Sequence, residues 1–311
     1  MISKKKPKSD FSRNVLALMT GSTIAQAIPI AISPILTRIY SPEDFGVLAL
    51  FVAISSIIGL ISNGSYEYAI MLPEKDEDAI NIFAIGLIIN ICISTTTLIL
   101  VILFHDNLIE LLKNEAISLW IYFIPLVIFL IGLFNLLTYF NNRLKNYKDI
   151  AKSNIYRSIT LVTIQLGIGL LKQGAYGLIS GQIISQFVAN GKLIKNILIM
   201  DLRRKIRKIK MTLLFKRYIR FPKYSMLANL LNISSYQLIN LLITYFYSIK
   251  TLGFYALVFK TMGIPANILG NSFSQVFLQE SIREKNLSGK SVNTFKNTFK
   301  KLLIIAIPAF S

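Results

Sequence analysis

Hydrophobic and polar residues alternate along this chain in long blocks, with uncharged apolar stretches separated by short polar segments. A stretch of about 20 apolar residues is the length that a helix needs to cross ~30 Å of hydrocarbon. Because the membrane interior offers no water to backbone amides, each stretch is expected to be helical. The pattern predicts an all-α integral membrane protein with nine spans, near residues 14–36, 46–70, 80–104, 117–140, 150–171, 174–198, 224–247, 252–278 and 298–311.

One segment between two apolar stretches occurs twice. The sequence TRIYSPEDFGVLALF, Thr37–Phe51, returns 207 positions later as TYFYSIKTLGFYALV, Thr244–Val258, with six identities in fifteen positions. Both copies join two long apolar segments, and both place a glycine at the start of the second segment. Internal duplication of membrane helices is typical of transporters, which move one repeat against the other. The duplication therefore predicts a polytopic helical bundle with two pseudo-symmetric lobes.

The spans and the duplication together suggest a domain organisation. We expect a cytoplasmic N-terminal tail at 1–13, a first six-helix lobe at 14–199, a basic cytoplasmic linker at 200–222 and an incomplete second lobe at 223–311. The last apolar run stops at Ser311, about half a span after it begins. If the second lobe matches the first, the complete protein has six helices in each lobe and this chain is truncated.

Basic residues orient the chain in the membrane. With the N-terminus placed in the cytoplasm, 28 of the 34 Lys and Arg residues fall in inward-facing segments, and only four fall in outward-facing ones. This asymmetry is what the positive-inside rule describes. The run Arg203–Lys210 resembles a nucleic-acid-binding patch, but spans flank it closely on both sides. We interpret it as a linker against anionic lipid headgroups, and we expect no nucleic-acid partner.

Several features of a membrane enzyme or pump are missing from the sequence. The outward-facing loops are too short to house a catalytic domain, such as that of a glycan polymerase or ligase. No nucleotide-binding motif is present, so direct use of ATP is not expected. The single cysteine, Cys92, permits no internal disulfide. We expect no enzymatic activity, no catalytic residues, no metal and no cofactor.

The segment Leu36–Gly46 (LTRIYSPEDFG), after a first span rich in Gly, Ser, Gln and Pro, resembles the polysaccharide transporter family. Supporting features are the short acidic loop after Pro73, Asn146 at the entry to the span at 150–171, and the long basic linker. The family contains O-antigen and capsule repeat-unit flippases of the multidrug/oligosaccharidyl-lipid/polysaccharide exporter superfamily. The resemblance covers essentially the whole chain.

The resemblance implies a function. The protein would be a flippase that moves undecaprenyl-pyrophosphate-linked oligosaccharide repeat units across the bacterial cytoplasmic (inner) membrane for surface polysaccharide biosynthesis. Its fold would be two six-helix bundles around a central, partly cationic cavity, working by alternating access. Its partners would be the lipid-linked glycan, membrane lipids and the glycan polymerase machinery. A drug or cation antiporter of the same superfamily is the alternative, which would need a carboxylate deep in a lobe.

Three basic residues are candidates for binding a pyrophosphate. Arg157 and Lys260 each lie about two turns inside a span, where a charge is costly and usually faces a cavity or a partner. Arg38 closes the first span. Guanidinium groups offer phosphate a planar fork of donors, and lysine adds a compact charge. The competing interpretation is that Arg157 and Lys260 extend to the interface, and that Arg38 is a simple anchor.

Polar residues also form a face on the span at 224–247. Spacings of three, four and four residues place them on one side of a helix, where they line a cavity or meet a neighbouring helix. We interpret this face as sugar-binding; it comprises Asn229, Asn232, Tyr236 and Asn240. On the span at 174–198, small residues four apart predict close helix packing instead. These are Gly177, Gly181, Ser185 and Ala189.

Glu67 is the only acidic residue near the interior of a span. Its carboxylate could carry a coupling proton or pair with a basic residue. Because Glu67 lies at the inner end of its span, we expect it to be interfacial and to reach water. On this interpretation no carboxylate lies deep in a lobe, which favours the flippase over the antiporter.

Overall fold

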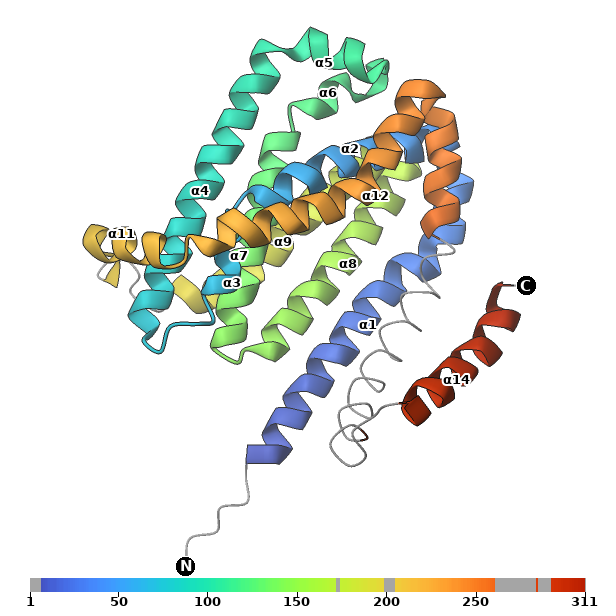
Figure 1. The fold of residues 1–311 in the computed structure, drawn as a ribbon. Coiled ribbons are helices and arrows are strands. Elements are labelled where there is room, and N and C mark those ends of the chain that lie inside the picture. The colour runs from blue at the N-terminus through green and yellow to red at the C-terminus, as the bar shows by residue number, and fades with distance from the viewer. Residues whose placement is uncertain (1–6, 172–173, 199–204, 261–283, 285–291, 311) are drawn as a thin grey trace, which may run out of the picture. The chain divides into compact units, whose positions relative to one another are not determined.

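The computed structural model describes residues 7–171, 174–198, 205–260, 284 and 292–310. Every secondary-structure element in these residues is a helix, which confirms the predicted all-α class (Figure 1). The chain divides into two compact units, Met1–Gly253 and Phe254–Ser311. Within the described residues, five helical segments are long and apolar enough to cross a membrane: Thr20–Ile39, Pro42–Ile61, Asp76–Leu103, Ile124–Arg143 and Phe221–Phe246. The total of nine spans stays a prediction.

The first unit is a bundle of helices joined by short connections. In chain order they are α1 (Pro7–Ile39), α2 (Pro42–Ile61), α3 (Tyr66–Ala69), α4 (Asp76–Leu103), α5 (His105–Leu112), the 3₁₀-helix η1 (Glu115–Ile117), α6 (Ser118–Ile121), α7 (Ile124–Arg143), α8 (Tyr147–Gly169), α9 (Tyr176–Leu198), α11 (Lys208–Arg217), the π-helical η2 (Phe221–Ser225) and α12 (Met226–Phe246). Another helix begins at residue 249 and is described to residue 260.

Two of the predicted spans are not continuous helices. The span predicted at 46–70 breaks after α2, where Gly64 and Ser65 both adopt left-handed backbone conformations with φ of 58°. A helix cannot continue through such residues, so the short α3 forms separately. The span predicted at 117–140 begins instead as η1 and α6, and α7 starts at Ile124. Pro125 lies in the first turn of α7, where a missing backbone N–H costs no hydrogen bond. The first break falls at Ser62–Ser65 (SNGS), a turn signal that the predicted span at 46–70 ran through.

The start of α2 is fixed by its own sequence. The Ser41 hydroxyl accepts the backbone N–H of Asp44 at 3.2 Å, and the Asp44 carboxylate accepts the backbone N–H of Ser41 at 2.9 Å. This reciprocal capping box satisfies two backbone donors that the first turn leaves unpaired. Pro42 occupies the first helical turn, where its fixed φ is favourable. The Ser-Pro-Glu-Asp run is therefore a helix-initiation signal.

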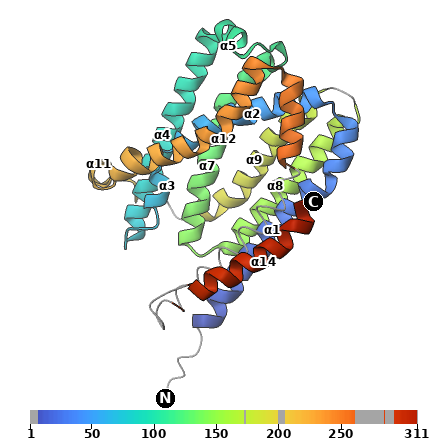
Figure 2. The same cartoon turned by 45° about the vertical axis from the view of Figure 1, so that its right-hand side comes forward.

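Helix α8 lies between α1 and α9, as Figures 1 and 2 both show. Small residues allow these helices to pack closely. A Cβ atom added to Gly21 of α1 would collide with Ala151 of α8. Similar collisions would occur at Gly181 with Gln165, and at Gly177 with Tyr40. The predicted close packing along α9 is confirmed.

The end of the bundle formed by α3, α11 and the N-terminus of α4 contains a dense buried core. Tyr66 is fully buried, its ring stacks on that of Phe215 at 5.5 Å, and its hydroxyl donates to the Phe215 carbonyl at 3.0 Å. Arg143, at the end of α7, donates to the carbonyls of Ile70 and Pro73 at 3.2 and 2.7 Å. Its guanidinium also contacts the Asp76 carboxylate at 3.0 Å. Burial and charge make these contacts strong.

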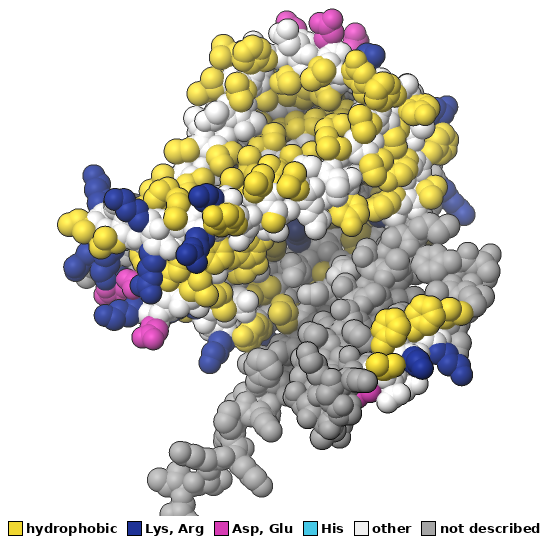
Figure 3. All heavy atoms as spheres, in the orientation of Figure 1, with side chains coloured by type: hydrophobic (Ala, Val, Ile, Leu, Met, Phe, Trp, Pro, Cys, Tyr) yellow, Lys and Arg dark blue, Asp and Glu magenta, His cyan; other side chains and the backbone are white. Residues whose placement is uncertain are grey.

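The surface of the first unit differs along its length. Figure 3 shows Lys and Arg side chains gathered about α11 with a few Asp and Glu side chains among them, further Asp and Glu side chains at the opposite end near α5, and hydrophobic side chains between the two ends. The exposed hydrophobic residues of the first unit include Ile99 and Ile102 of α4, each more than half exposed. A wide exposed apolar surface between polar ends is typical of a protein surrounded by lipid.

The second unit, Phe254–Ser311, is described only in part. Its helix α14 covers Val292–Phe310 and begins six residues before the predicted span at 298–311. The Glu284 carboxylate accepts the backbone N–H groups of Asn293 and Thr294 at 3.1 and 2.7 Å. These bonds stabilise the first turn of α14, where backbone donors lack helical partners. Most of the predicted span at 252–278 lies outside the described residues.

Candidate functional site

The predicted polar face of α12 is divided between two environments. Asn229 is half-buried, and its side-chain amide donates to the Tyr68 hydroxyl of α3 at 3.2 Å. Asn240 is also half-buried, and it donates to the side-chain carbonyl of Gln237 at 2.8 Å. Asn232 is exposed and Tyr236 is 62% exposed. One end of the face is thus joined to the first lobe, while its middle is uncovered in the described part of the chain.

Arg157 lies on α8, where its side chain is half-buried. Its guanidinium is 5.5 Å from the centre of the Phe134 ring of α7, a favourable cation–π distance. Among the described residues no carboxylate forms an ion pair with it. An aromatic ring holds the cation in place without occupying the N–H donors that a phosphate would use.

The other two predicted cations are in different surroundings. Arg38 is exposed in the last turn of α1. Lys260 is half-buried at the end of the described part of the last helix, and it belongs to the second unit. The proximity of Lys260 to Arg157 therefore stays a prediction.

Glu67 is buried, whereas the sequence predicted an interfacial carboxylate that reaches water. It lies on α3, between the membrane-spanning helices α2 and α4, and only 4% of its surface is exposed. One of its carboxylate oxygens has no hydrogen-bond partner in the described part of the chain. Burial raises the pKa of Glu67 to about 7, although a hydrogen bond from Asn63 opposes the rise. The break after Ile61 lets the short α3 pack inward, whereas the span predicted at 46–70 ran through this break.

Two tyrosines connect the surroundings of Glu67 to α12. The ring of Tyr68 packs edge-on against that of Tyr139 of α7, with centroids 5.2 Å apart, and it stacks near Phe221 of η2 at 6.5 Å. The Tyr68 hydroxyl also accepts the bond from Asn229. The residue next to the buried carboxylate therefore contacts the first helix of the second repeat directly.

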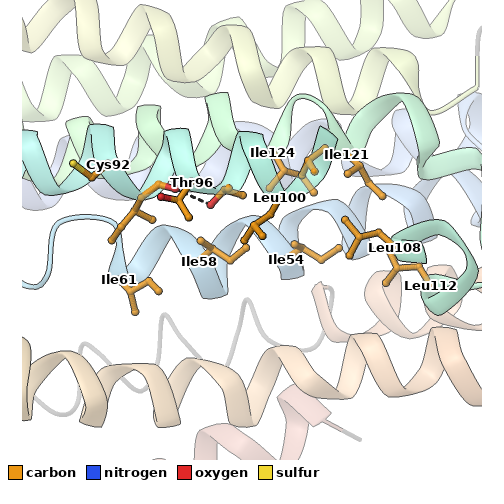
Figure 4. A pocket seen from close by; sticks show the side chains of 13 residues that line it. Ile54, Ile58, Ile61, Cys92, Thr96, Leu100, Leu108, Leu112, Ile121 and Ile124 are labelled. Atoms are coloured by element: carbon orange, nitrogen blue, oxygen red, sulfur yellow. Dashed lines mark hydrogen bonds between the residues drawn. The ribbon is translucent and has the colours of Figure 1, made fainter. Parts of the chain in front are cut away.

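An apolar cavity of about 500 Å³ lies between α2, α4 and α5. Figure 4 shows side chains of all three helices gathered round it, including Ile54 and Ile58 of α2, Thr96 of α4 and Leu108 of α5. The hydroxyl of Thr97 donates to the Ile93 carbonyl at 2.8 Å, so it needs no other partner. A space of this chemistry suits a hydrocarbon chain better than water.

A comparison with family models matches residues 35–311 to the polysaccharide biosynthesis protein family. The chain belongs to this family. The match starts just before the repeated turn and covers most of the chain, as the resemblance read from the LTRIYSPEDFG segment predicted. No curated protein and no solved structure matched the chain. Family membership and the apolar helices together make this a multi-pass membrane protein with a role in polysaccharide biosynthesis.

For this member of the polysaccharide biosynthesis family, sequence reasoning missed two residues of the candidate site. Neither Tyr68 nor Tyr139 was singled out from the sequence, because a tyrosine near a membrane boundary is common. Tyr68 is 161 positions from Asn229, and no local pattern predicts a hydrogen bond over that separation. Only the packing of α3 against η2 and α12 brings the two residues together.

Proposed function

We propose that this protein is a flippase for undecaprenyl-pyrophosphate-linked oligosaccharide repeat units in the bacterial cytoplasmic membrane. Membership of the polysaccharide biosynthesis family over residues 35–311 carries the proposal. A chain with apolar helices and short outward loops lacks room for glycan synthesis, so transport is the role that fits. The N-terminus is cytoplasmic, and the end of the bundle bearing α5 and the α1–α2 turn faces outward.

The first unit offers a site for each part of such a cargo. The guanidinium of Arg157 suits the pyrophosphate, and the exposed amide and hydroxyl of Asn232 and Tyr236 suit sugar hydroxyls. The apolar cavity between α2, α4 and α5 suits part of the prenyl chain, which could enter it from the bilayer. The cargo then moves by alternating access between the two repeats.

Transport is tested directly in proteoliposomes that contain a fluorescent polyprenyl-pyrophosphate oligosaccharide. The fraction quenched by external dithionite reports movement between leaflets. We expect Arg157→Gln to slow this movement about tenfold or more, because a charge-assisted contact is lost. Lys152→Gln is the matched control, since Lys152 is an exposed cation on the same helix. No protein-dependent movement of the lipid would refute the flippase, and equal rates for the two variants would refute the role of Arg157.

One observation favours a second function, a proton-coupled drug or cation antiporter. Such a protein needs a buried carboxylate with a pKa near neutrality, and Glu67 has both properties. An inward proton gradient would then drive efflux of a lipophilic cation from the same proteoliposomes, and Glu67→Gln would abolish it. The flippase assignment predicts movement of the lipid-linked oligosaccharide and no cation efflux.

A further inference from the structure

The second copy of the repeated turn starts its helix as the first copy does. Ser248 corresponds to Ser41 after the 207-residue offset, and its hydroxyl accepts the backbone N–H of Thr251 at 3.1 Å. In the first copy the same bond runs from Asp44 to Ser41 at 3.2 Å. The two copies therefore share a helix cap as well as a sequence, which supports a common origin.

The two turns also contact each other reciprocally. A Cβ atom added to Gly46 would overlap the backbone carbonyl of Ile249, and one added to Gly253 would overlap that of Pro42. Gly46 corresponds to Gly253, and Pro42 corresponds to Ile249, so each glycine meets the same element of the other copy. A contact that repeats when the partners are exchanged is the property of a two-fold axis. The paired turns, residues 41–46 and 248–253, surround such a pseudo-symmetry axis.

An ion pair crosses the same axis. The Lys250 ammonium is 3.5 Å from the Glu43 carboxylate, and these two residues also occupy equivalent positions. Identical charges at equivalent positions would face and repel each other, whereas this chain carries opposite charges there. The two side chains are 58% and 44% exposed, so the pair contributes little to the free energy of unfolding. It can break without leaving a buried charge.

We propose that the paired turns are the outer gate of the transporter, closed in this structure, and that they separate when cargo leaves. This inference rests on the proposed function, which places this end of the bundle outside. The gate is built for reversible contact. Glycine allows the backbones to approach closely, and the Glu43–Lys250 pair that crosses the axis is solvated on both sides.

Cross-linking tests the gate. In a Cys92→Ser background, Glu43→Cys and Lys250→Cys are bridged by a short bis-methanethiosulfonate reagent, and lipid movement is measured as above. We expect the unbridged protein to transport, the bridged protein to lose at least nine-tenths of its rate, and a reductant to restore it. The control pair is Glu77→Cys with Lys210→Cys. In the unsubstituted protein these residues form another solvated ion pair, with the Lys210 ammonium 2.7 Å from the Glu77 carboxylate, and this pair joins α4 to α11. Bridging that pair should leave transport intact.

The outcomes separate the gate from the proposed function. If the bridged gate variant transports as fast as the unbridged one, the paired turns do not need to separate and the gate is refuted. If the unbridged variants move no lipid-linked oligosaccharide, the flippase itself fails. A measurement independent of cargo then tests the gate. Modification of Ile249→Cys by an impermeant maleimide should become several-fold faster when Gly46→Ala forces the turns apart, and an unchanged rate would refute the gate.

Discussion

The two ends of the first unit are held together by different kinds of contact. At the α3 end, Arg143 is largely buried and binds backbone carbonyls as well as Asp76, and Tyr66 is fully enclosed. At the opposite end, the paired turns meet through two glycines and one solvated ion pair. Buried hydrogen bonds from a charged group cost about 2 kcal/mol or more to break, whereas exposed pairs cost about 1 kcal/mol or less. We therefore expect the α3 end to stay together and the paired turns to be able to separate.

The largest effect is expected at the glycines of the separable end. Gly253→Ala places a methyl group against the Pro42 backbone carbonyl, which cannot move aside as a flexible side chain would. We expect a loss of transport of at least tenfold, with destabilisation of about 1–3 kcal/mol from overpacking. Gly191→Ala is the control, because a Cβ there meets open space. Equal activity of the two variants would contradict the close contact.

Glu67 should make the α3 end sensitive to pH. Its pKa is raised, so the protonated carboxyl stabilises the fold at low pH, and that stability is lost as pH rises through about 7. A rise from 4.5 to about 7 corresponds to roughly 3 kcal/mol. Thermal unfolding in detergent should show the wild type less stable at pH 8 than at pH 5, and Glu67→Gln should remove most of that difference. An unchanged pH profile in the variant would assign the dependence to other groups.

Arg143→Met should destabilise the same end while leaving in place the pH dependence that Glu67 causes. The substitution keeps the aliphatic length but leaves the carbonyls of Ile70 and Pro73 without their donor. We expect a loss of about 2 kcal/mol in the free energy of unfolding, measured as a lower unfolding temperature. Lys148→Met, at an exposed position on α8, should change it little. A similar shift in both variants would mean that the buried bonds contribute nothing specific.

The smallest effect is expected at the ion pair of the paired turns. Glu43→Lys places two cations across the pseudo-symmetry axis, and solvent screening should limit the destabilisation to under about 1 kcal/mol. Adding Lys250→Glu restores opposite charges and should restore the stability. The comparison of the two ends would be wrong if Glu43→Lys were as damaging to stability as Arg143→Met.

The sequence alone was enough for the coarse architecture of this protein. Long uncharged stretches can be satisfied only by helices in a membrane, so the all-α class followed from hydrophobicity. The repeat at Thr37 and Thr244 identified the turn regions that the structure places face to face. The small residues of α9 predicted close packing, because only small side chains let two helices approach. The Leu36–Gly46 segment carried the resemblance to the family, and the family match over residues 35–311 confirms it.

The tertiary structure decided which chemical groups meet. The run Ser62–Ser65 (SNGS) is a turn signal, so the break after Ile61 was readable from the sequence although the predicted span at 46–70 ran through it. The burial of Glu67 was not readable, because it depends on how α3 packs against the neighbouring helices. The contact of Tyr68 with Asn229, and that of Gly46 with the turn containing Gly253, join residues more than 150 positions apart. Periodicity and charge can be read directly from neighbouring residues. Contacts between distant segments depend on how the helices pack, and no local pattern specifies this packing.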